Sequence, residues 1–380
     1  MKRNTYSALA LSAMCIFANA QNAPASAPSA PSAPAYTIYG LIDVGEESIG
    51  NVGASNSNLV RMASTTGALP SRVGIRGSKD LGEGLSGVFT LESGFAPDSG
   101  TSGQGGRLFG RQGFVGLSGG WGSATVGRQY TMLYWSMLDA DVIGPMVFGL
   151  GSLDSYIPNT RVDNSLAWKG TFSGLTLGAT FSTGRDSANP TPNNPAGTNC
   201  GGETANDTNA CREWSVLVKY DQPTWGVAVA VDEMNGGAGS WAALGLTSSD
   251  LTDRRTTVNG YYKLGGVKLA GGVMTRNNMG SVATPKSDLV FFGVSYPVTP
   301  SFVVDAQLSQ LTFKDSFNKA QLVVVRGTYS LVNGLVVYGG LGQISNEGAL
   351  AISVSSGGPG SNPVASASQT GIVGGIRYAF

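Results

Sequence analysis

The sequence of 380 residues contains no histidine at all. This absence excludes imidazole acid–base catalysis and every metal site that has a histidine ligand. Charged side chains are also scarce, because Asp, Glu, Lys and Arg together make up 13% of the chain, with 24 basic residues against 24 acidic ones. Nucleic-acid-binding proteins normally carry a basic excess, so this balance argues against a nucleic-acid partner.

Long hydrophobic runs are missing as well. No apolar run approaches the roughly 18 to 20 residues that a membrane-spanning helix needs, and the mean hydropathy is close to zero. The protein is therefore either soluble or a membrane protein whose apolar residues alternate with polar ones. No motif for a metal or another cofactor stands out, and we expect none.

The first 20 residues, MKRNTYSALALSAMCIFANA, have the three parts of a secretory signal peptide. Two basic residues come early, residues 8–17 are mostly apolar, and the stretch ends in a small-x-small pattern that closes at Ala20. We therefore predict that residues 1–20 direct export and are cleaved after Ala20. The Pro/Ala/Ser-rich residues 21–35 cannot form a core, and we expect them to be an extended linker.

Cysteine is the third scarce residue, with three in the chain. A lipoprotein signal centred on Cys15 fits poorly, because Met14 occupies a position where a small residue is expected. The other two, Cys200 and Cys211, lie in a polar stretch whose C-x10-C spacing is typical of neither zinc nor redox sites. An even count in an exported chain indicates a disulfide, which in so short a loop would stabilise the fold by about 3 kcal/mol.

The body of the chain, residues 36–380, repeats one pattern in which apolar and polar residues alternate over about ten positions. In WSVLVKY, for example, Lys219 lies on the face opposite the aromatic and aliphatic side chains. The segments are joined in turn by short connections, such as DQPT and LVNG, and by long polar ones, such as residues 185–212 and 345–367. Seven short and eight long connections predict sixteen strands.

Short turns on one rim and long loops on the other are typical of an outer-membrane β-barrel. A soluble β-sandwich or propeller would also alternate, but it would pack its apolar face against another sheet and would leave the loop asymmetry unexplained. We therefore predict an all-β protein, a 16-stranded antiparallel transmembrane β-barrel wide enough to hold an aqueous lumen.

The chain ends in GIVGGIRYAF, which has the alternation of a complete strand. The last strand of a barrel must pair with the first, because unpaired backbone groups in lipid cost several kcal/mol each. We expect Phe380 to close the wall and Tyr378 to lie in an interfacial aromatic girdle. The barrel-assembly machinery is the partner that we expect this strand to engage.

Two long stretches carry a family resemblance. SRVGIRGSKDLGEGLSGVFTLESGF, followed by GRLFGRQGFVGLSGGWGSATVGRQY, resembles the second to fifth strands of the Gram-negative trimeric general porins, especially their betaproteobacterial branch. The opening YTIYGLIDVG and the terminal Phe match too, so the similarity runs from about Tyr36 to the end. The resemblance implies a sixteen-stranded barrel, a homotrimer, and a third loop that folds into the lumen as a constriction.

The candidate third loop is residues 131–160, which are too apolar for a solvated surface loop. Buried against the inner wall, this composition becomes reasonable. Its carboxylates would then face the pore or pin the loop to the wall; they are Asp139, Asp141 and Asp154. Related porins often carry an acidic residue after the loop proline, but here Pro145 is followed by Met146, which weakens the negative side of the constriction.

Arginines form the candidate positive side. Alternation turns Arg72, Arg76 and Arg161 toward the lumen, and the resemblance places Arg72, Arg111 and Arg161 opposite the third loop. Arg128 is a further candidate, although alternation settles neither Arg111 nor Arg128, because aliphatic side chains share their face. Each arginine could instead simply pair with a nearby carboxylate or a loop carbonyl. A cluster weakens that alternative, since like charges about 4 Å apart repel by roughly 1 kcal/mol in water.

These features predict a passive, water-filled channel for ions and small hydrophilic solutes, with a mild anion preference. It would lie in bacterial outer-membrane lipid as a multi-pass barrel and homotrimer. An outer-membrane enzyme is not supported, because the chain has no histidine and no recognisable nucleophile–base arrangement. A substrate-specific channel or a surface adhesin-like barrel remains the alternative.

Overall fold

The computed structural model describes residues 35–63, 67–190, 194, 196–240 and 244–380. The predicted signal peptide, residues 1–20, lies outside these ranges, as does the predicted linker up to residue 34. The first strand begins at Ala35, the last residue of that predicted linker.

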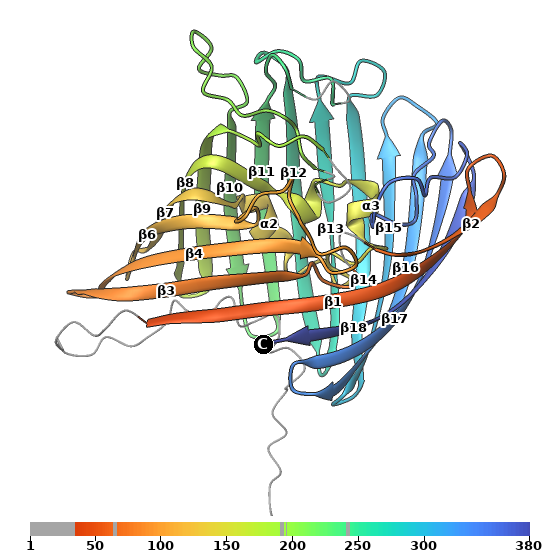
Figure 1. Ribbon diagram of the computed structural model, residues 1–380, viewed down its shortest axis with the longest axis horizontal. Helices are drawn as coiled ribbons and strands as arrows, with labels where there is room; N and C mark the ends of the chain where they lie inside the picture. The colour runs from red at the N-terminus through yellow and green to blue at the C-terminus, as the bar shows by residue number, and fades with distance from the viewer. Residues whose placement is uncertain (1–34, 64–66, 191–193, 195, 241–243) are drawn as a thin grey trace, which may run out of the picture.

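The described residues form one closed antiparallel β-barrel (Figure 1). Its wall has sixteen strands, as predicted from the alternation and the connections. The wall strands are β1 (Ala35–Val52), β3 (Arg72–Gly82), β4 (Leu85–Ala96), β6 (Gln112–Gly119), β7 (Gly122–Tyr130), β8 (Arg161–Phe172), β9 (Leu175–Gly184), β10 (Glu213–Asp221), β11 (Trp225–Asn235), β12 (Thr252–Leu264), β13 (Val267–Asn278), β14 (Lys286–Thr299), β15 (Phe302–Phe313), β16 (Lys319–Val332), β17 (Leu335–Glu347) and β18 (Ser368–Ala379).

The barrel closes where the two ends of the wall meet. Strand β1 pairs with β18 in a continuous register that runs from Leu41 opposite Ala379 to Ile49 opposite Gly371. The last residue extends this ladder: the Phe380 N–H donates to the Gly40 carbonyl at 3.1 Å, and the Gly40 N–H donates to the Phe380 carbonyl at 2.9 Å. No edge strand is left at this seam, which is what a bilayer requires of a sheet.

The predicted short connections are tight turns at one rim. Two of them contain a glycine with positive φ, Gly174 at +89° and Gly334 at +81°, a conformation that side chains with a Cβ rarely adopt. The other rim carries the long loops, so the two rims differ as the sequence predicted. In an outer-membrane barrel the short turns lie on the periplasmic side.

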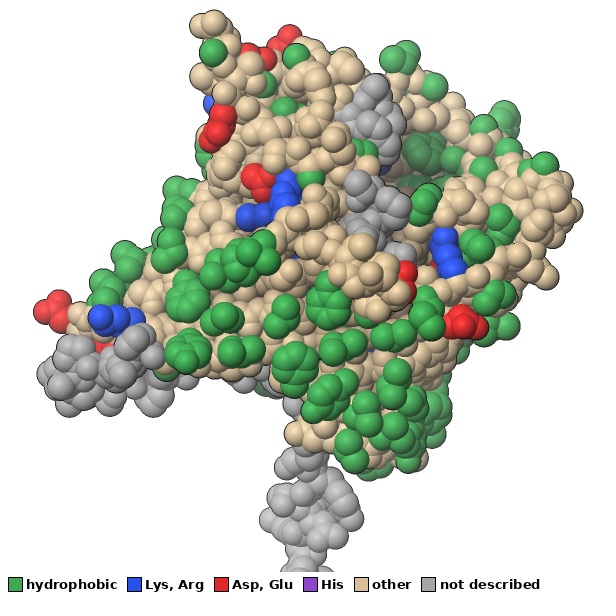
Figure 2. Space-filling view, in the orientation of Figure 1, with side chains coloured by type: hydrophobic (Ala, Val, Ile, Leu, Met, Phe, Trp, Pro, Cys, Tyr) green, Lys and Arg blue, Asp and Glu red, His purple; other side chains and the backbone are tan. Residues whose placement is uncertain are grey.

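Alternation along the strands separates two faces. Apolar side chains cover the outer wall and gather over β1, β3 and β4 in the lower half of the view in Figure 2. Val73 and Ile75 on β3 belong to this outer set, and the arginines that flank them in the sequence, Arg72 and Arg76, therefore point inward. The outer face meets lipid and the inner face meets water.

The remaining elements lie in loops. Strand β2 (Ser57–Met62) extends β1 as a hairpin beyond the wall, and β5 (Thr101–Ser102) pairs with the end of β4. The helical segments α2 (Met132–Met137), α3 (Leu150–Leu153) and η2 (Ile157–Asn159) all belong to the connection between β7 and β8. Among the described residues, no helix is both long enough and apolar enough to cross a membrane.

Candidate functional site

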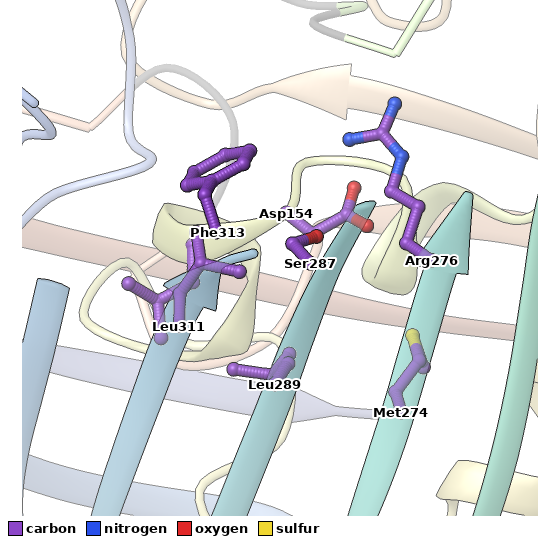
Figure 3. Close-up of a pocket in the computed structure, with 8 residues that line it drawn as sticks. Asp154, Met274, Arg276, Ser287, Leu289, Leu311 and Phe313 are labelled. Atoms are coloured by element: carbon purple, nitrogen blue, oxygen red, sulfur yellow. The ribbon is translucent and has the colours of Figure 1, made fainter. Parts of the chain in front are cut away.

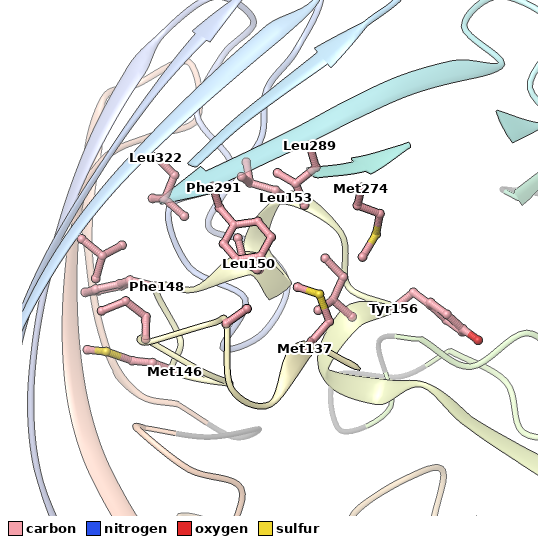
Figure 4. Close-up of a cluster of buried hydrophobic side chains, with 14 of the residues drawn as sticks. Met137, Met146, Phe148, Leu150, Leu153, Tyr156, Met274, Leu289, Phe291 and Leu322 are labelled. Carbon is pink, nitrogen blue, oxygen red and sulfur yellow. The ribbon is translucent and has the colours of Figure 1, made fainter. Parts of the chain in front are cut away.

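The third loop, residues 131–160, lies inside the barrel, where its apolar side chains pack against the inner wall (Figure 4). Phe148, Leu150 and Leu153 of the loop share one buried cluster with Phe291 and Leu322 of the wall. Burying each such side chain stabilises the docked loop by roughly 1.5–3 kcal/mol. The apolar composition of the loop, unusual for a connection, is therefore explained by its position.

Glycines on β17 and β18 make room for the loop. A Cβ atom added to Gly371 would lie 2.6 Å from Cζ of Phe148, and one added to Gly340 would lie 2.3 Å from Cε of Met146. Met146 is almost completely buried there. The residue that replaces the acidic group expected after Pro145 thus serves to attach the loop to the wall.

Polar contacts fix the middle of the loop. The Lys219 ammonium of β10 donates to Oδ2 of Asp139 at 2.5 Å. The Gln307 side chain on β15 donates to Asp141 Oδ1 at 3.0 Å, and the Arg326 guanidinium of β16 donates to the Ile143 carbonyl at 2.7 Å. Both aspartates therefore pin the loop to the wall, one of the two roles that the sequence allowed for them.

The returning end of the loop is attached by buried charges. The Arg255 guanidinium of β12 donates to both carboxylate oxygens of Asp154, at 2.8 and 3.2 Å, and also to Asp253 at 3.0 Å. The Tyr156 hydroxyl lies 2.5 Å from Oε1 of Glu213 and 2.8 Å from Oδ1 of Asp232. Sequence reasoning did not identify these wall partners, which lie 57 to 101 residues away along the chain.

A small cavity remains beside this attachment (Figure 3). Its volume is about 30 Å³, and it is lined by Asp154, Arg276 and Ser287 on its polar side and by Leu289 and Phe313 among its apolar residues. One or two water molecules fit in such a space. The cavity is too small for a solute and belongs to the seam between loop and wall.

Burial disfavours the charged form of every carboxylate in the third loop, and the neighbouring groups decide whether the pKa of each one rises or falls. At Asp139, the Lys219 ammonium outweighs burial and holds the pKa of the carboxyl below its usual range. At Asp154, burial is outweighed by the Arg255 guanidinium, which lowers the pKa to about 2. At Asp141, burial outweighs the hydrogen bonds that the carboxylate accepts and raises its pKa. Asp139 and Asp154 are therefore negative, ion-paired groups at neutral pH.

Three of the predicted arginines meet on the wall between β3 and β8, where Arg72 begins β3, Arg161 begins β8 and Arg111 immediately precedes β6. Arg111 donates to Glu92 Oε1 at 2.7 Å and to the Tyr130 hydroxyl at 2.8 Å. Arg161 donates to the same hydroxyl at 2.8 Å, and the Nε of Arg72 lies 3.7 Å from Glu92. We name these five residues, Arg72, Arg111, Arg161, Glu92 and Tyr130, the arginine group. It contains three guanidinium groups and one carboxylate.

The arginine group is partly covered by the start of the third loop. Tyr134 of α2 stacks on Tyr130 with ring centroids 3.8 Å apart. Arg111 and Arg161 are 5% and 2% exposed, whereas the side chain of Arg72 is 11% exposed. Arg72 is therefore the most accessible of the three.

The other two predicted arginines lie apart from this group. The Arg76 guanidinium lies 5.1 Å from the ring centroid of Tyr39 on the neighbouring strand. Arg128 donates to Asp163 at 2.5 Å and to the Gly110 carbonyl at 2.7 Å. Arg128 thus makes the local pairing with a carboxylate and a loop carbonyl that the sequence left open for each arginine.

The idea of arginines set directly against loop aspartates needs revision. The described partners of Arg72 and Arg111 include Glu92 on their own side of the barrel, while Asp139 is paired with Lys219. Glu92 was missed, although its position on β4 could have shown it, because a charged residue within a barrel strand faces the lumen.

The other predicted residues are placed as follows. The sulfur atoms of Cys200 and Cys211 are bonded within the loop between β9 and β10. Tyr378 and Phe380 are about half exposed on the outer face of the seam, with ring centroids 6.2 Å apart. Across the described ranges, no group of three or more acidic or cysteine side chains is arranged to hold a metal ion.

Comparison with known proteins agrees with this architecture. A family model described as Gram-negative porin matches residues 7–349. An outer membrane porin protein of Bordetella pertussis is 31% identical over 277 residues, which cover 69% of this chain and 67% of the relative. Outer membrane porin protein 32 of Delftia acidovorans is 26% identical over 358 residues, covering 90% of this chain and 93% of the relative.

Solved structures match the barrel along its length. The solved structure of an anion-selective porin from Comamonas acidovorans has a TM-score of 0.74 at 22% identity and covers 92% of this chain and 100% of its own. OmpT of Vibrio cholerae, in its trimer form, has a TM-score of 0.61 at 13% identity, with 92% and 100% covered. With a family match over most of the sequence and a sixteen-stranded barrel, the chain belongs to the Gram-negative porin family, and it is an outer-membrane channel protein for small solutes rather than an enzyme.

Proposed function

We propose that the channel conducts ions and small hydrophilic solutes by passive diffusion, with a mild preference for anions. The observation that carries this proposal is the arginine group, in which three guanidinium groups face one carboxylate. The aspartates of the third loop oppose it weakly, because Asp139 is paired with Lys219 and Asp141 lies against the wall. An excess of one sign along a narrow lumen biases ion choice toward the opposite sign. The anion-selective porin from Comamonas acidovorans has a similar barrel, which supports the same preference.

The zero-current potential across a planar bilayer tests the proposal. With purified protein under a KCl gradient, we expect a stable conductance and a potential whose sign shows a preference for chloride. A cation preference would contradict the selectivity and leave the channel intact. A membrane that stays electrically silent after verified insertion would contradict the open channel itself.

The finer features of assembly are part of the same proposal. The chain would be exported with residues 1–20 cleaved, inserted by the barrel-assembly machinery through its C-terminal strand, and assembled as a homotrimer in outer-membrane lipid. The half-exposed Phe380 at the seam supports the role of the last strand, and the trimer form of a similar barrel supports the oligomer.

Mass measurement tests export and oligomer together. The denatured mass of protein isolated from outer membranes is expected to begin at Gln21, and the native mass in detergent is expected to correspond to three copies. Retention of the first 20 residues would contradict the cleavage of a signal peptide. A native mass of one copy would contradict the homotrimer. Deletion of Phe380 is expected to lower the amount of assembled barrel, whereas unchanged assembly would argue against recognition of the C-terminal strand.

A further inference from the structure

We propose that the periplasmic half of the lumen carries a second anion site, which binds solutes with two or more negative charges. The site is formed by Lys169, Lys219, Lys263 and Lys268, which we name the lysine arc. This inference rests on the proposed open channel and adds a class of solute to it. The arc is separate from the arginine group, with which it shares no residue.

The four lysines lie close to the short turns and point into the lumen. Lys219 is flanked on β10 by the outward Val218 and Tyr220, which are 53% and 37% exposed. Lys263 alternates in the same way with Tyr262 and Leu264, which are exposed on the outside of β12. Because successive side chains of a strand point to opposite faces, the ammonium groups are on the water side.

Lys263 and Lys268 form the centre of the arc. They lie directly opposite each other in the register of β12 and β13. Both ammonium groups lie near the ring of Tyr261, at 5.2 and 5.0 Å from its centroid. Like charges placed opposite each other across a strand pair are destabilising, and a multivalent anion between them would relieve this repulsion.

Lys219 and Lys169 continue the arc toward the third loop. Lys219 contacts Asp139 at 2.5 Å and Asp221 at 3.0 Å. The Lys169 ammonium lies 3.3 Å from the ring centroid of Trp135 on α2, and the contact described for it is with this ring rather than with a carboxylate. The negative face of an aromatic ring attracts a cation, so Trp135 holds the Lys169 ammonium at the end of the arc next to the third loop.

Charge and spacing together define the ligand. Five inward-facing residues next to the short turns of β8 to β13 are charged: the four lysines of the arc and one acidic residue, Asp221. The third loop adds a second carboxylate, that of Asp139. A positive excess of this kind favours a solute that brings at least two charges. One strand and two register positions separate Lys169 from Lys219, and one strand and four register positions separate Lys219 from Lys263. At a strand spacing of about 4.8 Å and a rise of about 3.4 Å per residue, their Cα atoms are roughly 12 Å and roughly 16 Å apart, respectively. A small multivalent anion can therefore engage the central pair, and a longer one can reach Lys219 as well.

Block of the chloride current tests the arc. With wild-type channels in a KCl-bathed bilayer, pyrophosphate added to both sides is expected to reduce the conductance saturably. In the double variant K263Q/K268Q, we expect the half-blocking concentration to rise at least tenfold. Citrate is tested in parallel, because it brings multiple charges without phosphate; block by either anion supports the site, and the more potent anion identifies the preferred chemistry.

Two controls show whether a loss of block is caused by the lysine arc: a variant that lacks two lysines elsewhere, and the current recorded before the blocking anion is added. The double variant K314Q/K319Q removes two partly exposed lysines at the loop rim and is expected to keep the wild-type half-blocking concentration. Absence of saturable block by both anions in a conducting, anion-preferring wild-type channel would overturn the arc alone. Equal block in wild type and K263Q/K268Q would overturn it too. A wild-type channel without conductance would instead contradict the proposed function.

Discussion

Replacing Arg72 and Arg76 together by Gln is expected to reduce the anion preference of the channel about fivefold. Both side chains face the lumen from β3, and when Arg72 is replaced the buried Glu92 keeps its 2.7 Å contact with Arg111. Two unit charges at about 5 to 10 Å from a passing ion contribute about 1 kcal/mol in water. A difference of that size changes a permeability ratio about fivefold.

The measurement is the chloride-to-potassium permeability ratio from zero-current potentials. Arg254→Gln is the matched control, because Arg254 is half exposed on the outer side of β12 and its loss should leave the ratio unchanged. A wild-type ratio in R72Q/R76Q would show that the filter lies elsewhere. In that case the lysine arc becomes the main source of selectivity, and K263Q/K268Q would lower the ratio instead.

The barrel could be predicted from sequence because its signals are local. A period of two along each strand and a Gly, Pro, Asn or Asp cluster at each turn are properties of ten consecutive residues, and the strand count follows from them. The same alternation placed Arg72 and Arg76 on the inner face of β3.

Alternation could not place Arg128 and Arg111, and the structure gives a reason for each. The register between β7 and β8 shifts between Gly127 and Gln129, so the inward and outward faces change over at Arg128 itself. Arg111 precedes β6 and belongs to a loop end, where no alternation applies. The alternation within a strand does not predict which way a side chain points on the far side of a bulge or beyond the end of the strand.

The wall residues that bind the third loop could not be predicted from the sequence, for a different physical reason. Arg255 and Asp154 are 101 residues apart in the chain, and Gln307 and Asp141 are 166 residues apart. Which wall residue meets which loop residue depends on barrel closure and on the path of the third loop, and neither is a local property. The sequence therefore predicted that the loop would be attached, but not by what.

Replacing Asp154 by Asn is expected to make the open channel unstable. Arg255 is 2% exposed and would be left with Asp253, a partner that it shares with Arg276. Removing one partner of a buried ion pair costs about 3 kcal/mol, at the lower end of the usual range because Asp253 remains. This loss favours detachment of residues 149–160 from the wall about a hundredfold. We expect frequent brief closures in single-channel recordings of D154N, where the wild type gives a steady current.

The double variant D154N/R255Q separates charge burial from simple loss of a contact. It removes the cation that D154N leaves without its loop partner, while Asp253 keeps its contact with Arg276 at 2.7 Å. The double variant should therefore close less often than D154N, which a purely steric role of Asp154 would not produce. Asp250→Asn, at an exposed position of a surface loop, should record like the wild type. A steady current in D154N would mean that Tyr156 and the apolar cluster of Phe148, Leu150 and Leu153 are sufficient to hold the third loop against the wall.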